Sequence, residues 1–299
     1  MSTWRIGIDL GGTKIEIAAL DDSGAVRLRE RIATPSGYND ALATMAEMVR
    51  GIEGKIGVQA SVGIGIPGAI SPAMGVVKNA NSNPLNGHAL HTDMSLLLGR
   101  EIRVENDANC FALSEAVDGA GAGYGTVFGV ILGTGCGGGL VVEGKLLTGR
   151  QHLTGEWGHM PLPWQTAEEY PGKKCWCGAR GCLEIFVSGP GLAADCDGGG
   201  ARDASGIPTR AAAGEARAIA ALQRHADRLG RGLAVLVTLL DPDVIVLGGG
   251  LSNMAHLYTQ VPEIMRRHVF SDVCHTPIVR AKHGDSSGVR GAAWLWPPK

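Results

Sequence analysis

A strand, a glycine turn and a second strand occur twice in this chain. The first copy, GIDLGGTKIEIAALDDSG, covers residues 7–24, and the second, GVILGTGCGGGLVVEGKL, covers residues 129–146. In the first copy apolar residues alternate on both sides of the turn, which is typical of two paired strands. The repeat predicts two halves that begin with the same strand arrangement and face each other.

Strand and helix patterns alternate through the rest of the chain, which favours an α/β fold. A 3.6-residue apolar period predicts a long helix over about 214–240 and a shorter one near 39–52. Further elements are predicted for SVGIGIPGAI (61–70, a buried strand), REIRVENDANCFALSEAVDGA (100–120, a strand running into a helix), DVIVLGGGLS (243–252, a strand) and the segment after Ser286 (a closing helix).

Composition excludes several classes of partner. The formal net charge is −2 and the basic residues are scattered, which argues against nucleic acid because phosphate neutralisation needs a basic face. Asp9 interrupts the first apolar stretch, so we expect no signal peptide, and no apolar run is long enough for a bilayer. The odd count of 7 cysteines favours free thiols and a cytoplasmic protein.

The glycine turns have two readings, a plain β-turn or a phosphate cradle. Each lies between two strands, so neither is a Walker A loop or a dinucleotide fingerprint. Backbone N–H groups of a glycine hairpin can still approach an anion, and the second copy favours this reading. Asp9 is either a turn cap or a ligand of Mg²⁺ through water. The candidate phosphate residues are Gly11, Gly12, Thr13 and Lys14 in the first turn and Gly133, Thr134 and Gly135 in the second.

Three cysteines fall within CWCGARGCLE, residues 175–184. A disulfide between Cys175 and Cys177 would be strained, and the spacing is not that of a thioredoxin-like pair. Three thiolates from a glycine-rich knuckle, Cys182 being the third, suit tetrahedral Zn²⁺ with His159 as the fourth ligand. The alternative is unligated thiols.

The predicted metal site brings a polar cluster with it. Glu156 precedes His159 by three residues and Glu184 follows Cys182 by two. A His that uses one ring nitrogen on zinc offers the other to another partner. Two carboxylates and an imidazole are what a site for several sugar hydroxyls requires. The alternative is that both glutamates are surface charges.

Asn106-Asp107 occupies a strand-to-helix junction. Asp107 is either a helix N-cap or a general base that takes a proton from a hydroxyl as it attacks phosphorus. If Asp107 is the base, most of the remaining rate enhancement would come from positioning of the reactants and from neutralisation of the phosphate charge.

Taken together, seven motifs resemble the ROK group (repressors, open reading frames, kinases) of sugar kinases. They are spread over nearly the whole chain, in the family's order, and are IGIDLGGTK, ENDANCFALSEA, VILGTGCGGG, GEWGHMPLP, CWCGARGCLE, DPDVIVLGGGLS and KHGDSSGVRGAAWL. The resemblance is closest to bacterial fructokinases of the manno(fructo)kinase type, with N-acetylglucosamine kinase a near relative. It implies an actin-like/ribonuclease-H-like ATPase fold: two α/β domains with a cleft between them.

The resemblance also implies domain boundaries and residue roles. The first domain would be discontinuous, 1–118 plus 286–299, and the second would be 119–285 with a zinc-binding insertion at about 159–184. A homodimer is implied, as are ATP, Mg²⁺ and structural Zn²⁺. The implied roles are Asp107 as catalytic base; Gly68, Asn79, Asn81, Asn106, Glu156, His159 and Glu184 around the sugar; both glycine turns on phosphate; Gly248, Gly249 and Gly250 beside the adenosine; and His159, Cys175, Cys177 and Cys182 on zinc.

The leading functional expectation is ATP-dependent phosphorylation of a hexose. Fructose, giving fructose 6-phosphate, is the first choice and mannose the second, with N-acetylglucosamine kinase or glucokinase as the alternative. A sugar-responsive repressor of the family would carry a helix-turn-helix ahead of the first strand, which here begins by Trp4. A non-catalytic sugar binder would lack Asp107 or the turns.

Overall fold

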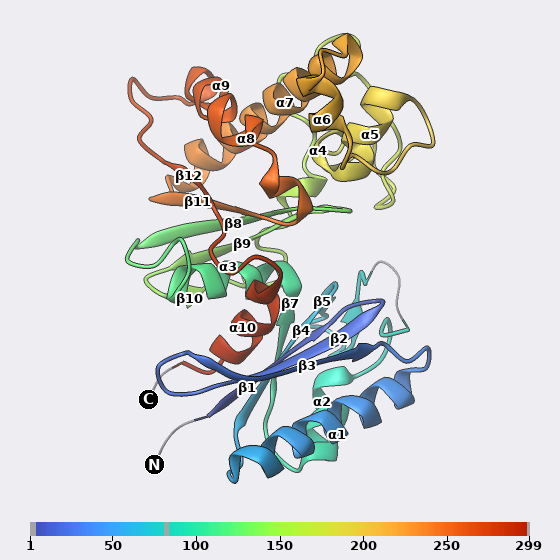
Figure 1. Cartoon of the computed structure of the whole chain (residues 1–299), viewed down its shortest axis with the longest axis vertical. Helices are drawn as coiled ribbons and strands as arrows, with labels where there is room; N and C mark the ends of the chain where they lie inside the picture. Colours follow the sequence, from blue (N-terminus) through green and yellow to red (C-terminus); the bar gives the residue numbers. More distant parts are fainter. Residues whose placement is uncertain (1–3, 81–83, 298–299) are drawn as a thin grey trace.

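Two five-stranded mixed sheets form the centre of the molecule, and the structure, a computed structural model, describes residues 4–80 and 84–297 (Figure 1). The first sheet has the order β3-β2-β1-β4-β7 and the second β10-β9-β8-β11-β12. The first contains β1 (Arg5–Leu10), β2 (Lys14–Leu20), β3 (Val26–Ala33), β4 (Ser61–Ile66) and β7 (Arg103–Asn106). The second contains β8 (Thr126–Leu132), β9 (Cys136–Val142), β10 (Lys145–Leu146), β11 (Val244–Gly248) and β12 (Ile278–Arg280).

The two sheets share one topology. In each, three antiparallel strands (β1–β3 or β8–β10) are followed across the first strand by two parallel ones. The glycine turns join β1 to β2 and β8 to β9, at corresponding positions. The repeat that the alternating pattern predicted is therefore present in the fold.

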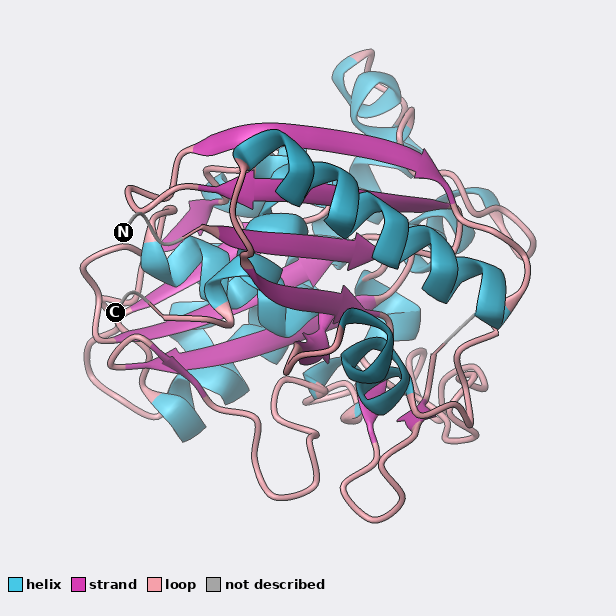
Figure 2. Ribbon diagram, turned by 90° about the horizontal axis from the view of Figure 1, so that it is seen from below, coloured by secondary structure: helices cyan, strands magenta, loops and turns pink. Residues whose placement is uncertain are grey.

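Helices cover both sheets. In the first half, α1 (Tyr38–Ile56) lies over the outer face of the first sheet, as the view from below shows (Figure 2). It contributes Met45, Val49 and Ile52 to the core. The remaining elements of this half are α2 (Leu90–Leu98), the hairpin β5 (Ala69–Ile70) and β6 (Val77–Lys78), and α3 (Asp107–Val117).

In the second half, α7 (Ala216–Leu240) is the long predicted helix and contributes residues such as Leu229, Leu233 and Val237 to the core of this half. Shorter helices surround it: η1 (Trp157–His159), α4 (Glu184–Val187), α5 (Gly189–Asp197), α6 (Ile207–Ala212), η2 (Gly250–Asn253), α8 (His256–Thr259), α9 (Val261–His268) and η3 (Gly284–Ser286). No helix of the described part of the chain is long and apolar enough to cross a bilayer.

The closing helix α10 (Ser287–Trp294) returns to the first sheet and lies with α3 between the two sheets (Figure 1). Glycines permit this close packing. A Cβ on Gly7 or Gly63 would overlap backbone carbonyls of α10, and a Cβ on Gly291 would overlap the carbonyl of Cys110 in α3. The predicted boundaries at residues 118 and 286 stay a prediction, but α10 does pack on the first sheet.

Replacing Gly291 by Ala tests this packing. The new methyl group must push α10 away from α3, so we expect a loss of about 2 kcal/mol in the free energy of unfolding, despite the better helix propensity of Ala. Gly51→Ala in α1 is the matched control, because a Cβ there meets nothing within 4 Å. The control should gain about 0.5–1 kcal/mol. Denaturant titration measures the free energy of unfolding of both variants. Equal changes in the two would contradict the close approach of α10 to α3.

A buried ion pair anchors the segment between η1 and α4 to the rest of the second half. Glu169 accepts from Arg228 Nε and Arg231 Nη2 of α7, each at 2.8 Å. All three side chains are almost fully buried. Removing one partner of such a pair leaves an uncompensated buried charge. The segment is therefore fixed to α7 independently of its cysteines.

Candidate active site

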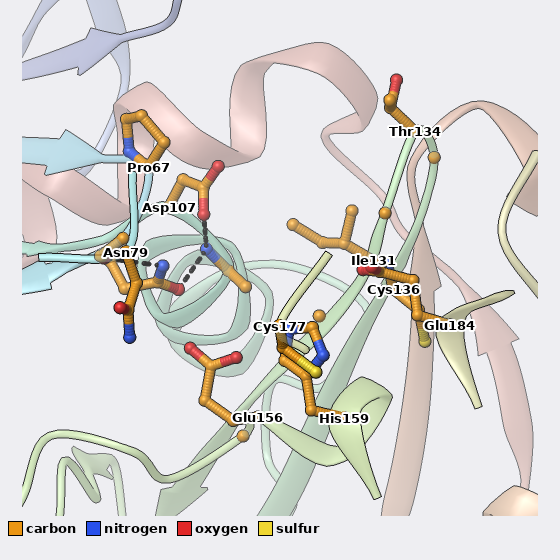
Figure 3. Close-up of a pocket in the computed structure, with 18 of the residues that line it drawn as sticks. Pro67, Asn79, Asp107, Ile131, Thr134, Cys136, Glu156, His159, Cys177 and Glu184 are labelled. Atoms are coloured by element: carbon orange, nitrogen blue, oxygen red, sulfur yellow. Dashed lines mark hydrogen bonds between the residues drawn. The ribbon is translucent and has the colours of Figure 1, made fainter. Parts of the chain in front are cut away.

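A pocket of about 760 Å³ is lined by residues from both halves (Figure 3). The lining includes eleven of the predicted site residues: Gly68, Asn79, Asn106, Asp107, Gly133, Thr134, Gly135, Glu156, His159, Cys177 and Glu184. Asp9, Gly11, Gly12, Thr13, Lys14, Cys175, Cys182 and Gly248–Gly250 are described but lie outside this lining. Asn81 lies outside the described residues. The predicted catalytic residue and most of the predicted sugar-binding residues thus meet in one place.

The structure shows which residue caps α3. Asn106 Oδ1 accepts from the N–H groups of Ala108 (2.9 Å) and Asn109 (3.2 Å), so Asn106 is the N-cap of α3. Its Nδ2 donates to the carbonyl of Gly68 at 2.9 Å, leaving one amide N–H for a ligand. Asp107 is therefore not the cap, although its Oδ1 accepts from Ala108 N–H at 2.8 Å.

The carboxyl of Asp107 sits among other acidic groups. Burial, and next the charge of Asp9, raise the pKa of Asp107 to about 7; Glu156 adds to the rise. Burial, and next Glu16, raise the pKa of Asp9 to about 6. A carboxyl whose pKa lies near neutral pH is suited to accept a proton in a reaction.

Both glycine turns present backbone N–H groups away from the protein. Gly11 O accepts from the hydroxyl of Thr34 at 2.7 Å, and Gly133 O accepts from Gly189 N–H at 2.8 Å. In a trans peptide the following N–H points opposite to the carbonyl, so those of Gly12 and Thr134 face away from these partners. Gly12 and Thr134 are exposed. This arrangement fits an anion at either turn.

The third glycine segment, residues 248–250, lies next to the second glycine turn, residues 133–135. Gly249 has a φ of 79°, and a Cβ there would overlap the carbonyl of Leu132, the last residue of β8. Gly248 packs equally closely on the ring of Phe111 in α3. Only glycine allows β11 to end so close to the turn that follows β8.

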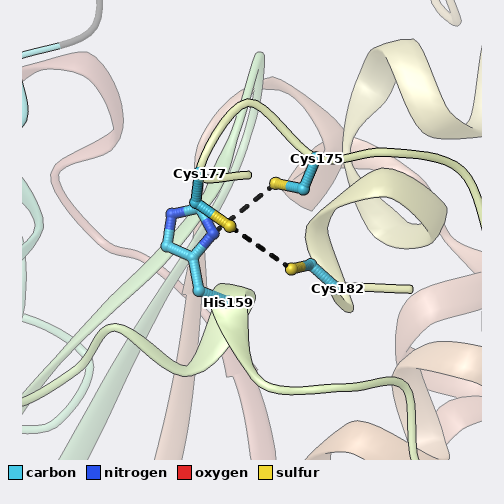
Figure 4. A group of neighbouring side chains, drawn as sticks. All are labelled: His159, Cys175, Cys177 and Cys182. Carbon is cyan, nitrogen blue, oxygen red and sulfur yellow. Dashed lines mark hydrogen bonds between the residues drawn. The ribbon is translucent and has the colours of Figure 1, made fainter. Parts of the chain in front are cut away.

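His159, Cys175, Cys177 and Cys182 form one cluster (Figure 4). Their candidate ligand atoms lie within 4.8 Å of one another. Cys177 Sγ is 3.6 Å from Cys182 Sγ, and Cys175 Sγ is 3.7 Å from His159 Nδ1. Two thiolates on one tetrahedral zinc at ~2.3 Å would lie ~3.8 Å apart, so the donor set fits this ion. With Nδ1 toward the sulfurs, Nε2 is the nitrogen left for another partner.

Trp176 is a pocket residue that the sequence reasoning missed. It lies between two cysteines of the cluster, and its indole N–H donates to Glu184 Oε1 at 2.8 Å. Glu184 Oε2 accepts from the N–H of Cys136 at 2.9 Å. Both oxygens of Glu184 are thus held, whereas Glu156 is an exposed carboxylate at the pocket. In the sequence, the only indication of a role for Trp176 was its position between two cysteines with metal-binding spacing.

Comparison with known families now adds to this geometry. A sequence model of the ROK family matches residues 5–299. The chain belongs to the ROK family. It is 42% identical over 296 residues to N-acetyl-D-glucosamine kinase of Yersinia pseudotuberculosis serotype O:1b (strain IP 31758), with 97% of each chain covered.

Two solved ROK structures resemble the chain over nearly its whole length. The ROK hexokinase from Thermus thermophilus matches with a TM-score of 0.87 and 31% identity, covering 98% of this chain and 97% of that one. The ROK family glucokinase from Streptomyces griseus, in complex with glucose and AMPPNP, matches with a TM-score of 0.78 and 28% identity, covering 98% of each. The predicted actin-like fold with two α/β domains is confirmed.

The narrower resemblance to fructokinases is not confirmed. ROK relatives at 41% to 43% identity, from Yersinia and Vibrio species, are N-acetyl-D-glucosamine kinases. The sequence prediction placed this enzyme as the alternative to fructokinase.

Proposed function

We propose that the chain is an ATP-dependent sugar kinase whose substrate is N-acetyl-D-glucosamine. The observation that carries the kinase assignment is Asp107: it lines the pocket, its pKa is raised to about 7, and Asn106 rather than Asp107 caps α3. The named relatives favour N-acetyl-D-glucosamine over fructose and mannose. They are matched over nearly their whole length, which favours a kinase over a repressor.

In the proposed reaction Asp107 accepts the proton of a sugar hydroxyl as that oxygen attacks the γ-phosphorus of ATP. The bond from the γ-phosphorus to the β–γ bridging oxygen breaks, and ADP leaves with that oxygen. Glu156, Glu184 and His159 Nε2 bind other hydroxyls, and the spare N–H of Asn106 is a further donor. The glycine turns hold the phosphates through backbone N–H groups. Asp9 would hold Mg²⁺ through water, and this ion would supply neutralisation of the phosphate charge. The cluster of His159 and three cysteines would hold zinc as a closed, structural site.

The homodimer expected from the resemblance and the cytoplasmic location expected from the cysteines belong to this proposal as well. The dimer has a direct measurement. Sedimentation of the purified protein should give twice the chain mass of 31.0 kDa. A monomer at micromolar concentration would remove the dimer from the proposal.

The substrate is tested by measuring ADP release with Mg-ATP and one sugar at a time: N-acetylglucosamine, glucose, fructose and mannose. We expect the highest kcat/KM for N-acetylglucosamine, because a site built to bind particular polar groups rejects sugars that lack them. A higher value for fructose would restore the first expectation. Turnover of none of the four would remove the kinase proposal.

The pH dependence of kcat/KM follows from the raised pKa of Asp107. The base must be ionised, so activity is present above the pKa of the folded enzyme and falls about tenfold per pH unit below it. We expect a midpoint of about 7 rather than the ordinary 3.8 of an aspartate. Steady-state assays between pH 5 and 9 measure it, and a midpoint near 4 would contradict the assignment.

A further inference from the structure

Trp176 touches the metal cluster and the sugar pocket at once. It lies between Cys175 and Cys177, and the edge of its ring meets His159 with 4.9 Å between centroids at 82°. Its side chain is 60% exposed, yet the indole N–H donates to Glu184 at 2.8 Å instead of pointing to bulk water.

The two contacts of Glu184 differ in kind. Its Oε2 is held by the backbone N–H of Cys136, the first residue of β9, which the β8–β9 ladder fixes. Its Oε1 accepts a hydrogen bond from the side chain of Trp176 and, among the described residues, from no other group. An ionised carboxylate has about four acceptor positions, so about two remain for sugar hydroxyls. The direction in which these free acceptor positions of Glu184 point depends on where the indole of Trp176 lies.

The position of the indole depends in turn on the cluster. A metal ion held by Cys175 and Cys177 would fix the backbone on both sides of Trp176. Cys175 is buried, but the residues that follow Trp176, including Cys177 and Gly178, are exposed, so few side chains pack on this side of the turn. Glycine at 178, with a φ of 95°, adds conformational freedom when no metal is bound.

We propose that Trp176 is a positioning residue that links the metal cluster to Glu184 and thereby sets the affinity for the sugar. This inference rests on the proposed function of the pocket. In this inference Trp176, which lies between two metal ligands, affects substrate binding through the side chain of Glu184.

Trp176→Phe tests the link, because phenylalanine keeps a ring at this position and loses the N–H. We expect the sugar Kd, measured by calorimetry, and the sugar KM to rise about tenfold, while kcat and the KM for ATP change less than about twofold. Trp164→Phe is the matched control: Trp164 is 55% exposed, stacks on His268 and lies outside the pocket lining. An unchanged Kd in Trp176→Phe would overturn the proposal.

Metal content separates positioning from a structural role. Trp176→Phe should retain the same zinc per chain as the wild type, measured by mass spectrometry of the metal. Loss of zinc in this variant would show that Trp176 acts on the cluster itself, which would also overturn the proposal.

A spectral measurement separates this inference from the proposed function. The difference in emission between wild type and Trp176→Phe reports the Trp176 indole alone. Glu184→Ala should shift that difference spectrum to the red, because the freed N–H meets water. No shift would refute the contact. If the protein bound no sugar, the proposed function would fail while the spectra still decided whether Trp176 holds Glu184.

Discussion

Asp107→Asn should lower kcat by about 10²- to 10⁴-fold and leave sugar binding within about threefold of the wild type. The amide keeps the oxygen that accepts from Ala108 N–H at 2.8 Å, so the local backbone has no reason to move. It cannot take a proton from the sugar hydroxyl. Coupled ADP release measures kcat, and calorimetry measures sugar affinity.

The same substitution should stabilise the protein. Because the pKa of Asp107 is raised to about 7, the folded state disfavours its charged form, and at pH 8 this costs stability. Replacing the carboxylate by a neutral amide should add about 1–2 kcal/mol to the free energy of unfolding at pH 8, and less at pH 5. Asp203→Asn is the control for activity and should leave kcat unchanged, because Asp203 is exposed and lies outside the pocket lining. Activity of Asp107→Asn within tenfold of wild type would eliminate Asp107 as the base.

Removing metal should weaken sugar binding by at least about tenfold, because His159 and the Trp176–Glu184 contact lose their anchor. Chelation should release one zinc ion per chain. The segment should stay attached to α7 through Glu169 and the two arginines, so we expect no global unfolding. Metal analysis, calorimetry with N-acetylglucosamine and far-UV circular dichroism measure the three effects.

Cys182→Ser should reproduce the effect of chelation, since Cys182 is buried within the cluster. Cys274→Ser is the matched control, because Cys274 lies outside the cluster and is only half-buried. Two results would contradict the link between the cluster and the pocket: purified protein that contains no metal, or metal-free protein that keeps its full affinity for the sugar.

The hairpins and their glycine turns were predictable from sequence because strand alternation and glycine turns are local signals. The Cys-x-Cys spacing likewise placed the cluster. The choice between Asn106 and Asp107 as the N-cap was not predictable, since both residue types cap helices and only hydrogen-bond geometry separates them.

Other features depend on contacts between distant segments. The fit of Gly291 against Cys110 requires both helices to be in place, and nothing periodic marks either residue. Trp176 was missed because one aromatic residue in a short loop has no pattern to support a role. The sugar depends on the arrangement of a few hydrogen-bonding groups, which motifs shared by a whole family do not specify.

The packing of α10 on the first sheet has a consequence for biosynthesis. Arg5 in β1 donates to the carbonyl of Trp296, 291 positions later in the chain. Translation delivers the first sheet before the second half and α10 after it, so the glycine-lined face that receives α10 stays bare while the second half is made. Such distant contacts also slow folding, because the chain must close a very long loop before they form. The nascent chain therefore cannot complete the packing of its first sheet until α10 has left the ribosome.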